Sequence, residues 1–198
     1  MRRWAAASNP AIREAFAAVD RRGFLTEHQQ RFADDDRPLP IGHGQTNSQP
    51  TTVANMLALL DVLPGQRVLD VGAGSGWTTA LLGHLVGPEG RVIGVELVPE
   101  LAVWGAANVG RHPVPWATEQ AAERDVLGRP AEGPYDRILV SAAPGGVPGE
   151  LVDQLVLGGL MVIPVRSRML TVRRQAEGPP EIHEHGSYSF VPLLRPHH

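Results

Sequence analysis

The chain has 198 residues, of which 42% are hydrophobic and 20% are charged, and its formal net charge is −3. This length and apolar fraction predict one globular domain with a substantial core, and the slightly acidic balance disfavours a nucleic-acid-binding surface. The absence of cysteine excludes disulfides, thiolate nucleophiles and cysteine metal sites. No apolar stretch has the length of a signal-peptide core or a bilayer span, so we expect a cytoplasmic protein with no membrane partner.

The first 64 residues are expected to form helices and a polar loop. Ser8-Asn9-Pro10 combines capping residues with a proline suited to a first helical turn, and apolar residues at helical spacing follow it. Residues 26–50 are polar and are expected to be irregular, with the acidic run Asp34-Asp35-Asp36 as a solvated loop. A second helix is expected to begin at Thr51 or its neighbour Thr52 and to end before residue 64.

Beyond residue 64 the pattern changes to apolar strands that alternate with helices. Strands are expected at 67–71, 91–97, 135–143 and 160–165, with a weakly marked strand within 115–126, and helices at 78–87, 99–110 and 147–159. Such alternation predicts an α/β fold with a doubly wound, mostly parallel, Rossmann-like sheet that is covered on both faces.

The C-terminal part of the chain is expected to close the sheet at one edge. Segments 169–174 and 187–194 read as strands with no helix between them, which predicts an antiparallel hairpin at the sheet edge. We therefore expect a single domain, 1–198. Its parts are N-terminal helices and a polar loop (1–64), a ligand-binding core (65–165) and C-terminal edge strands (166–198).

A glycine-rich turn from Asp70 to Gly76, with the sequence DVGAGSG, follows the first core strand. In a doubly wound sheet, ligands bind at the carboxyl ends of the strands, where the strand order reverses. Glu96 ends the second core strand, and a carboxylate there can accept hydrogen bonds from both hydroxyls of a ribose. Asp125 follows the weak third strand, where it either accepts from an adenine amino group or is an exposed turn residue.

Two ligand classes compete for this turn. A dinucleotide site requires Gly-x-Gly-x-x-Gly, whereas here Gly72, Gly74 and Gly76 alternate and Trp77 follows them. The acid at Asp70 would repel a phosphate and attract an ammonium or a sulfonium. S-adenosylmethionine carries a ribose, an amino group and a cationic sulfur but no phosphate, so the turn favours it over NAD. The remaining alternative is a glycine turn required only for packing.

Five segments carry a resemblance to a known family: GHGQTNSQP at 42–50, VLDVGAGSGWTTALLG, GVELVPEL, the long run from Tyr135 to Val165, and FVPLL near the C-terminus. In these segments the sequence resembles the protein-L-isoaspartate O-methyltransferases, from about Phe24 to Leu194. The resemblance implies S-adenosylmethionine as cofactor. It also implies that an isoaspartyl-containing protein or peptide is the substrate, methylated on its free α-carboxylate and then closed to a succinimide.

The same resemblance assigns roles to individual residues. It implies that Ser48 is the active-site residue, that Thr46 acts beside it, and that Gln45 belongs to the loop that closes over both ligands. Together with the glycine turn, the predicted cofactor-binding residues are Gln45, Asp70, Gly72, Ala73, Gly74, Ser75, Gly76, Trp77, Glu96, Leu97, Asp125 and Val126.

The composition of the 42–50 loop agrees with this chemistry. A carboxylate is already ionised at neutral pH, so its methylation requires no general base, nucleophile or metal, and depends on holding the oxygen in line with the methyl group. Neutral donors such as Ser48 and Thr46 can hold that oxygen without neutralising it. The alternative interpretation is a surface turn in which Ser48 and Thr51 cap a helix.

Several positions depart from the family pattern and leave other functions open. Arg166 and Arg168 stand where the family has a glycine turn and a glutamine, and Asn47 replaces a more usual aliphatic residue. The alternatives are a related carboxylate O-methyltransferase that acts on a modified peptide or small molecule, and a non-catalytic S-adenosylmethionine-binding homologue. The histidine pairs His183-x-His185 and His197-His198 have no third ligand at matched spacing, so we expect no metal.

Overall fold

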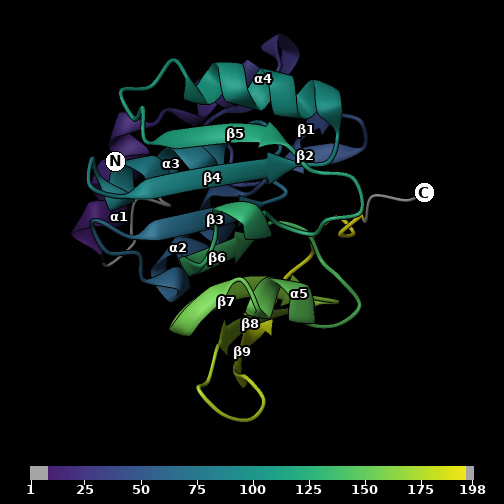
Figure 1. Cartoon of the computed structure of the whole chain (residues 1–198). Helices are drawn as coiled ribbons and strands as arrows, with labels where there is room; N and C mark the ends of the chain where they lie inside the picture. The colour runs from purple at the N-terminus through teal and green to yellow at the C-terminus, as the bar shows by residue number, and fades with distance from the viewer. Residues whose placement is uncertain (1–8, 195–198) are drawn as a thin grey trace.

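The computed structural model describes residues 9–194 and contains a central seven-stranded sheet in the order β5-β4-β3-β6-β7-β8-β9 (Figure 1). The strands are β3 (Arg67–Val71), β4 (Arg91–Glu96), β5 (Ala117–Ala121), β6 (Tyr135–Val140), β7 (Leu155–Val165), β8 (Arg168–Arg173) and β9 (Glu181–Ser187). The pairs from β5 to β7 are parallel, whereas β8 and β9 are added antiparallel. The predicted doubly wound, mostly parallel sheet is therefore confirmed, and its order reverses between β3 and β6.

Helices and a small hairpin surround this sheet. The helices are α1 (Pro10–Ala18), α2 (Pro50–Leu60), α3 (Trp77–Val86), α4 (Pro99–Val109) and α5 (Gly149–Val152), with 3-10 turns η2 (Arg21–Phe24), η3 (Glu27–Phe32) and η4 (Pro130–Glu132). The hairpin consists of β1 (Leu39–Gly42) and β2 (Gln45–Asn47). No helix within residues 9–194 combines the length and apolar character that a membrane span requires.

The apolar core lies on both faces of the sheet because the strands are buried on both sides. Val68 of β3 packs into a cluster with α1, α2 and α3, whereas the next residue, Leu69, packs into a second cluster on the opposite face. That second face is covered by α5 together with apolar residues of connecting segments, such as Leu127 and Val147. Alternate residues of one strand thus serve two cores, which accounts for continuous apolar runs in the sequence.

The starts of the two N-terminal helices agree with the capping signals. Asn9 caps α1, since its side-chain oxygen accepts a hydrogen bond from the Ala11 amide at 2.9 Å. Pro50 occupies the first turn of α2, one residue before the expected start, and Asp61 ends the helix in a left-handed conformation with φ of 49°. Ser8 and His197-His198 lie outside the described residues.

The prediction of irregular structure at 26–50 was wrong in part, because η3 and the β1–β2 hairpin occupy this segment. Asp34 and Asp36 of the acidic run are exposed, as expected, and Asp35 is half-buried. Asp36 also stabilises the start of α2. Its two carboxylate oxygens accept hydrogen bonds from the amide (2.9 Å) and the hydroxyl (2.7 Å) of Thr51. Asp36 therefore supplies the cap at the start of α2 from outside the helix.

Two further predictions near the C-terminus were wrong. The helix expected at 147–159 stops at Val152, and β7 begins at Leu155, because pairing with β6 outweighs the local helical spacing. The last strand is Glu181–Ser187 instead of 187–194. Its polar residues conceal it in the sequence, because an edge strand is solvated and tolerates charge.

Candidate active site

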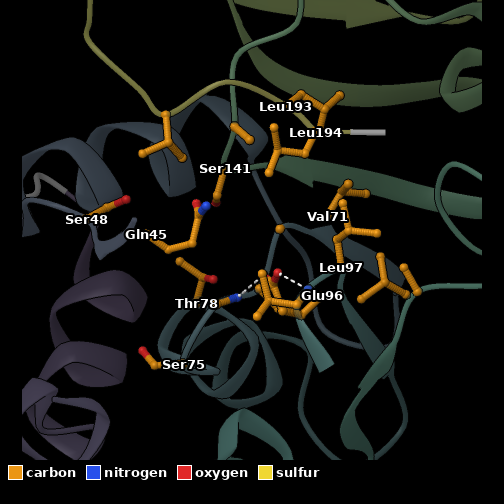
Figure 2. A pocket seen from close by; sticks show the side chains of 18 of the residues that line it. Gln45, Ser48, Val71, Ser75, Thr78, Glu96, Leu97, Ser141, Leu193 and Leu194 are labelled. Atoms are coloured by element: carbon orange, nitrogen blue, oxygen red, sulfur yellow. Dashed lines mark hydrogen bonds between the residues drawn. The ribbon is translucent and has the colours of Figure 1, made fainter. Parts of the chain in front are cut away.

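A pocket opens at the carboxyl ends of β3, β4 and β6, where the strand order reverses (Figure 2). Its lining comes from the hairpin, the glycine turn, the end of β4, the segment after β5, the end of β6 and the C-terminal tail. In residue numbers these are 45–48, 71–75 with 77–78, 95–98, 122 with 126–128, 141–142 and 191–194. The pocket thus lies where the doubly wound topology predicts a ligand.

The glycine turn is held against β4 by backbone hydrogen bonds. The amides of Gly72 and Ala73 both donate to the Val95 carbonyl, at 2.9 and 3.2 Å. Gly76 does not line the pocket: it caps α3 with φ of 86°, and a Cβ there would lie 2.8 Å from the Gly105 carbonyl oxygen of α4. This glycine permits close packing of α3 against α4, and a contact between Gly76 and a cofactor stays a prediction.

Glu96 is the only ionisable side chain among the described residues that line the pocket. It is 6% exposed, and its two carboxylate oxygens accept hydrogen bonds from the amides of Gly74 (2.8 Å) and Val98 (2.9 Å). Each oxygen keeps a lone pair that can accept from a ribose hydroxyl. A pocket with one carboxylate and no cationic side chain in its lining disfavours a phosphate and suits a ligand with hydroxyls and a positive charge.

Asp70 lies beneath the turn and not in the pocket. It is fully buried, and its Oδ2 accepts hydrogen bonds from the hydroxyls of Thr78 (2.6 Å) and Thr79 (2.8 Å). Burial raises its pKa to about 6, although both threonine hydroxyls act to lower it, and the charge of Glu96 raises it further. Because Thr78 lines the pocket, the structure places Asp70 to orient the Thr78 hydroxyl, and a direct contact between Asp70 and a ligand stays a prediction.

Asp125 does not line the pocket either, whereas Val126 and the two residues after it do. Its backbone is left-handed with φ of 59°, and its exposed carboxylate lies 3.9 Å from Arg124. This position agrees with the exposed-turn interpretation, and contact with an adenine amino group stays a prediction.

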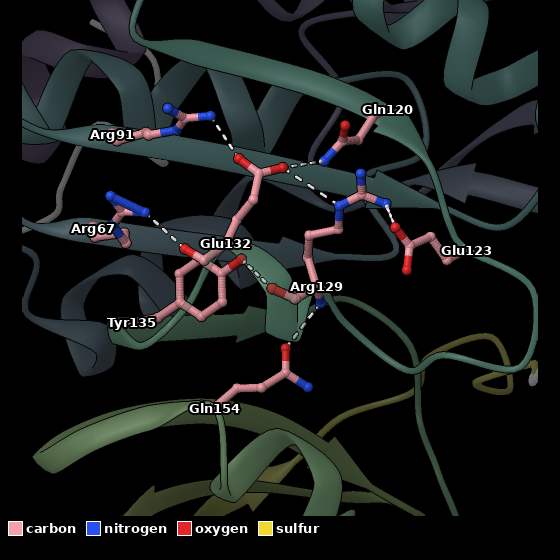
Figure 3. Close-up of polar contacts among 8 residues, drawn as sticks. All are labelled: Arg67, Arg91, Gln120, Glu123, Arg129, Glu132, Tyr135 and Gln154. Carbon is pink, nitrogen blue, oxygen red and sulfur yellow. Dashed lines mark hydrogen bonds and ion pairs between the residues drawn. The ribbon is translucent and has the colours of Figure 1, made fainter.

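Residues 126–128 of the pocket lining are followed by Arg129, which belongs to a polar network with Glu132 and Gln154 (Figure 3). The buried side chain of Gln154 donates to the Leu127 carbonyl and accepts from the Arg129 amide, both at 2.8 Å. Glu132 bonds to the guanidinium of Arg129 (3.4 Å) and to Arg91 of β4 (2.5 Å). This part of the pocket therefore has a fixed shape even though it lies in a loop.

Gln45 and Thr46 of β2, and Ser48 just after it, also line the pocket; their contact with a ligand stays a prediction. Figure 2 shows Ser48 and Gln45 on one side of the pocket and Glu96 with Leu97 on the other. Within residues 9–194, the Ser48 hydroxyl has no hydrogen-bond partner, while its carbonyl accepts from Arg21 at 2.9 Å. The backbone of Ser48 is therefore fixed and its hydroxyl is available to a ligand.

The sequence did not predict that residues 191–194, the roof of the pocket, belong to the site. Leu193 and Leu194 lie above the pocket in Figure 2. Two backbone hydrogen bonds hold this segment: the Ala143 amide donates to the Val191 carbonyl at 2.8 Å, and the Leu193 amide donates to the Ala143 carbonyl at 3.0 Å. Ser141 was missed as well, although it directly follows β6 at the reversal of strand order and could have been found by that rule.

The two arginines that depart from the family pattern do not line the pocket. Arg166 lies in the turn between β7 and β8 and donates to the Gly145 carbonyl at 3.1 Å. Arg168 lies on β8 and donates to the Ser187 hydroxyl at 3.3 Å. Neither contact places a cation against a ligand in the pocket.

The described part of the chain contains no cluster of three side chains with metal-ligand chemistry. His183 contacts Glu181 at 2.9 Å, and His185 bonds to the Thr171 hydroxyl at 2.8 Å. Both histidines of the β9 pair thus have protein partners.

A switch-point pocket whose lining has one carboxylate and no cationic side chain fits a Rossmann-like, S-adenosylmethionine-dependent methyltransferase. The sequence model described as protein-L-isoaspartate(D-aspartate) O-methyltransferase (PCMT) matches residues 2–197. The chain therefore belongs to the PCMT family.

Individual relatives agree with this assignment. The protein-L-isoaspartate O-methyltransferase of Aeropyrum pernix is 42% identical over 100% of this chain and 77% of its own length. The one from Methanopyrus kandleri is 43% identical over 92% of this chain and 83% of its own. A Plasmodium falciparum structure described as an enzyme of this family, in complex with S-adenosyl-L-homocysteine, has a TM-score of 0.81 at 25% identity, covering 95% of this chain and 92% of that one.

Proposed function

We propose that this protein transfers the methyl group of S-adenosylmethionine to the free α-carboxylate of L-isoaspartyl residues in damaged proteins or peptides, and that the resulting ester closes to a succinimide. One observation carries the proposal: in a chain of the PCMT family, a single pocket has a buried carboxylate on one wall and an unpartnered hydroxyl on the other. The absence of cysteine fits the reducing cytoplasm, where we place the protein.

Different residues of the pocket are suited to bind the cofactor and the substrate, and Glu96 with residues 126 and 127 forms the cofactor side. When bound, S-adenosylmethionine supplies an electrophilic methyl group on a cationic sulfur. Glu96 is placed to accept from the ribose hydroxyls while the Gly74 amide holds its Oε2. The apolar wall of Val126 and Leu127 suits the flat face of an adenine. Because the lining has no cationic side chain, nothing in the pocket opposes the positive sulfur.

Residues 45–48, at the end of the β1–β2 hairpin, are suited to position the isoaspartyl substrate. An isoaspartyl α-carboxylate is ionised at neutral pH, so it attacks without help from a base. The Ser48 hydroxyl can donate to one carboxylate oxygen, which directs the other toward the methyl group. Alignment of this kind supplies up to roughly 7–11 kcal/mol of barrier lowering. The uncharged hairpin therefore positions a nucleophile that is already active.

The substrate assignment predicts methylation of an isoaspartyl peptide and none of its aspartyl twin, because only the isoaspartyl residue has a free carboxylate bonded directly to its α-carbon. The free carboxylate of an aspartyl residue is one methylene further from the backbone. Mass spectrometry after incubation with S-adenosylmethionine measures the added methyl group. Methylation of neither peptide, with calorimetric binding of S-adenosylhomocysteine retained, would reject the substrate and favour a related carboxylate methyltransferase or a non-catalytic homologue.

Replacement of Ser48 by alanine is expected to lower kcat by roughly 10- to 100-fold, because a hydrogen bond to a charged group contributes about 1.5–3 kcal/mol. The affinity for S-adenosylhomocysteine should change by less than about twofold. Steady-state kinetics and calorimetry measure the two effects. Ser189→Ala, at an exposed residue outside the pocket lining, is the matched control. Equal losses in turnover and cofactor affinity would assign Ser48 to the cofactor.

A further inference from the structure

A buried polar bridge joins the hairpin to the glycine turn through one amide side chain. The side chain of Asn47, at the end of β2, is buried between Arg21 of η2 and Ser75 of the glycine turn. Its Oδ1 accepts from Arg21 Nε at 2.7 Å, and its Nδ2 donates to Ser75 Oγ at 3.1 Å. A single side chain thus connects the wall that faces the substrate to the turn that faces the cofactor.

Arg21 fixes the hairpin end of this bridge. It is only 1% exposed, and besides Asn47 Oδ1 its guanidinium donates to the backbone carbonyls of Asn47 (3.1 Å) and Ser48 (2.9 Å), as well as to those of Asp35 and Arg37 (both 2.9 Å). Its Cζ also lies 5.4 Å from the ring centroid of Trp77 at the start of α3. Burial lowers its pKa to about 10, so it is charged at neutral pH.

Ser75, at the glycine-turn end of the bridge, is held by contacts that do not involve the hairpin. Its carbonyl accepts from the buried Asn108 side chain of α4 at 3.0 Å. The neighbouring Gly74 amide is bonded to Glu96. The glycine turn is therefore held by α4 and β4 whether or not the hairpin is present, and Asn47 provides the side-chain hydrogen bond that connects the two walls.

Asn47 lies between the two predicted catalytic residues, Thr46 and Ser48, so the bridge can control their positions. Thr46 and Ser48 are the chain neighbours of Asn47, which ends β2. Fixing the Asn47 side chain on Ser75, and the carbonyls of Asn47 and Ser48 on Arg21, therefore restricts the directions in which Thr46 and Ser48 point. We propose that Asn47 is a positioning residue that couples the hairpin to the glycine turn and sets the distance between the Ser48 hydroxyl and the cofactor. This inference rests on the proposed function for what Ser48 does, but the coupling itself is testable without substrate.

The test compares Asn47→Leu with Thr171→Val, because each removes a buried, hydrogen-bonded polar side chain, and Thr171 lies on β8 outside the pocket lining. Hydrogen exchange with and without S-adenosylhomocysteine measures the coupling. In the wild type and in Thr171→Val, the ligand should slow exchange at residues 45–48 as well as in the glycine turn. In Asn47→Leu, protection of the glycine turn should remain and that of residues 45–48 should fall several-fold.

Measurements of kcat distinguish a role of Asn47 in positioning Ser48 from a role in the stability of the fold alone. At saturating cofactor, Asn47→Leu should lower kcat on the isoaspartyl peptide by about 10- to 100-fold, the scale expected for misplacement of a reacting group. Thr171→Val, at a matched loss of melting temperature, should keep kcat within about threefold. Equal protection of residues 45–48 in both variants, or equal falls in kcat, would overturn the proposal. A wild type that shows the exchange coupling but methylates no isoaspartyl peptide would reject the proposed function alone.

Discussion

A Glu96→Gln variant is expected to bind S-adenosylhomocysteine about 10- to 100-fold more weakly than the wild type. Both carboxylate oxygens of Glu96 accept backbone amides, from Gly74 and Val98, and a glutamine has only one oxygen to offer. Its NH2 group would face an amide donor, and one ribose hydroxyl would lose a charged acceptor, a change of about 1.5–3 kcal/mol. Calorimetric titration measures the loss.

The charge of Glu96 adds a second, separable expectation. S-adenosylmethionine carries a positive sulfur and S-adenosylhomocysteine does not, so the variant should lose more affinity for the cationic ligand. The matched control is Glu89→Gln, which removes an exposed carboxylate outside the pocket lining. Unchanged affinity for both ligands in Glu96→Gln would show that the ribose binds elsewhere.

The cofactor side of the pocket could be predicted from the sequence because its signals are local. A strand, a glycine turn and a helix follow one another within about 20 residues, and Glu96 ends the next strand. The structure brings Gly72, Gly74 and Glu96 together in the pocket lining. These positions follow from the doubly wound topology, in which the carboxyl ends of neighbouring parallel strands lie side by side.

The direction of each acidic side chain could not be predicted in the same way. Asp70 and Glu96 both lie at or near strand ends beside the glycine turn, yet only Glu96 lines the pocket. In a parallel sheet both faces of a strand are buried, so the apolar pattern has no alternation that reveals which way a residue points. The contacts of Asp70 with Thr78 and Thr79 appear only once α3 is packed against β3.

The sequence does not indicate the roles of residues whose contacts lie far away in the chain. Arg21 stands in an ordinary charged stretch, and its acceptors, four backbone carbonyls and Asn47 Oδ1, lie 14 to 27 positions away. The tail at 191–194 reads as a strand, but it reaches the pocket by bonding to Ala143. Such contacts depend on the assembled fold, which explains why the glycine turn was predicted and the roof and the buried arginine were not.

Glu119 of β5 is a buried carboxyl group that neither ligand explains. It is 7% exposed, and neither of its oxygens has a hydrogen-bond partner within residues 9–194. It fills space left by glycines: a Cβ at Gly105 would lie 2.1 Å from Glu119 Oε1, and one at Gly76 would lie 2.8 Å from Oε2. Burial raises its pKa to about 10, and the charges of Asp70 and Glu96 add to the rise. The folded protein therefore holds Glu119 protonated at neutral pH.

This protonation predicts that stability falls as pH rises. The unfolded chain releases the Glu119 proton near its ordinary pKa of about 4.5 and the folded chain retains it until about 10. Between these values the unfolded state binds fewer protons, so the free energy of unfolding decreases with pH. At pH 7 the loss amounts to about 3 kcal/mol, since one pKa unit corresponds to about 1.4 kcal/mol. The contribution of Glu119 is thus complete below pH 4.5 and declines above it.

Glu119→Gln should remove this penalty, because glutamine has nearly the same shape and is neutral at every pH. At pH 7 the variant should unfold with about 3 kcal/mol more free energy than the wild type, or roughly 6–12 °C higher. Near pH 4.5 the two proteins should be alike. Urea unfolding followed by circular dichroism at pH 4.5, 6 and 8 measures the slopes, with the exposed Glu177→Gln as control. The free energies of unfolding of Glu119→Gln and the wild type diverge with pH only if the folded state holds a proton on Glu119 that the unfolded state releases. Parallel dependence on pH would therefore mean that Glu119 is ionised in the folded protein.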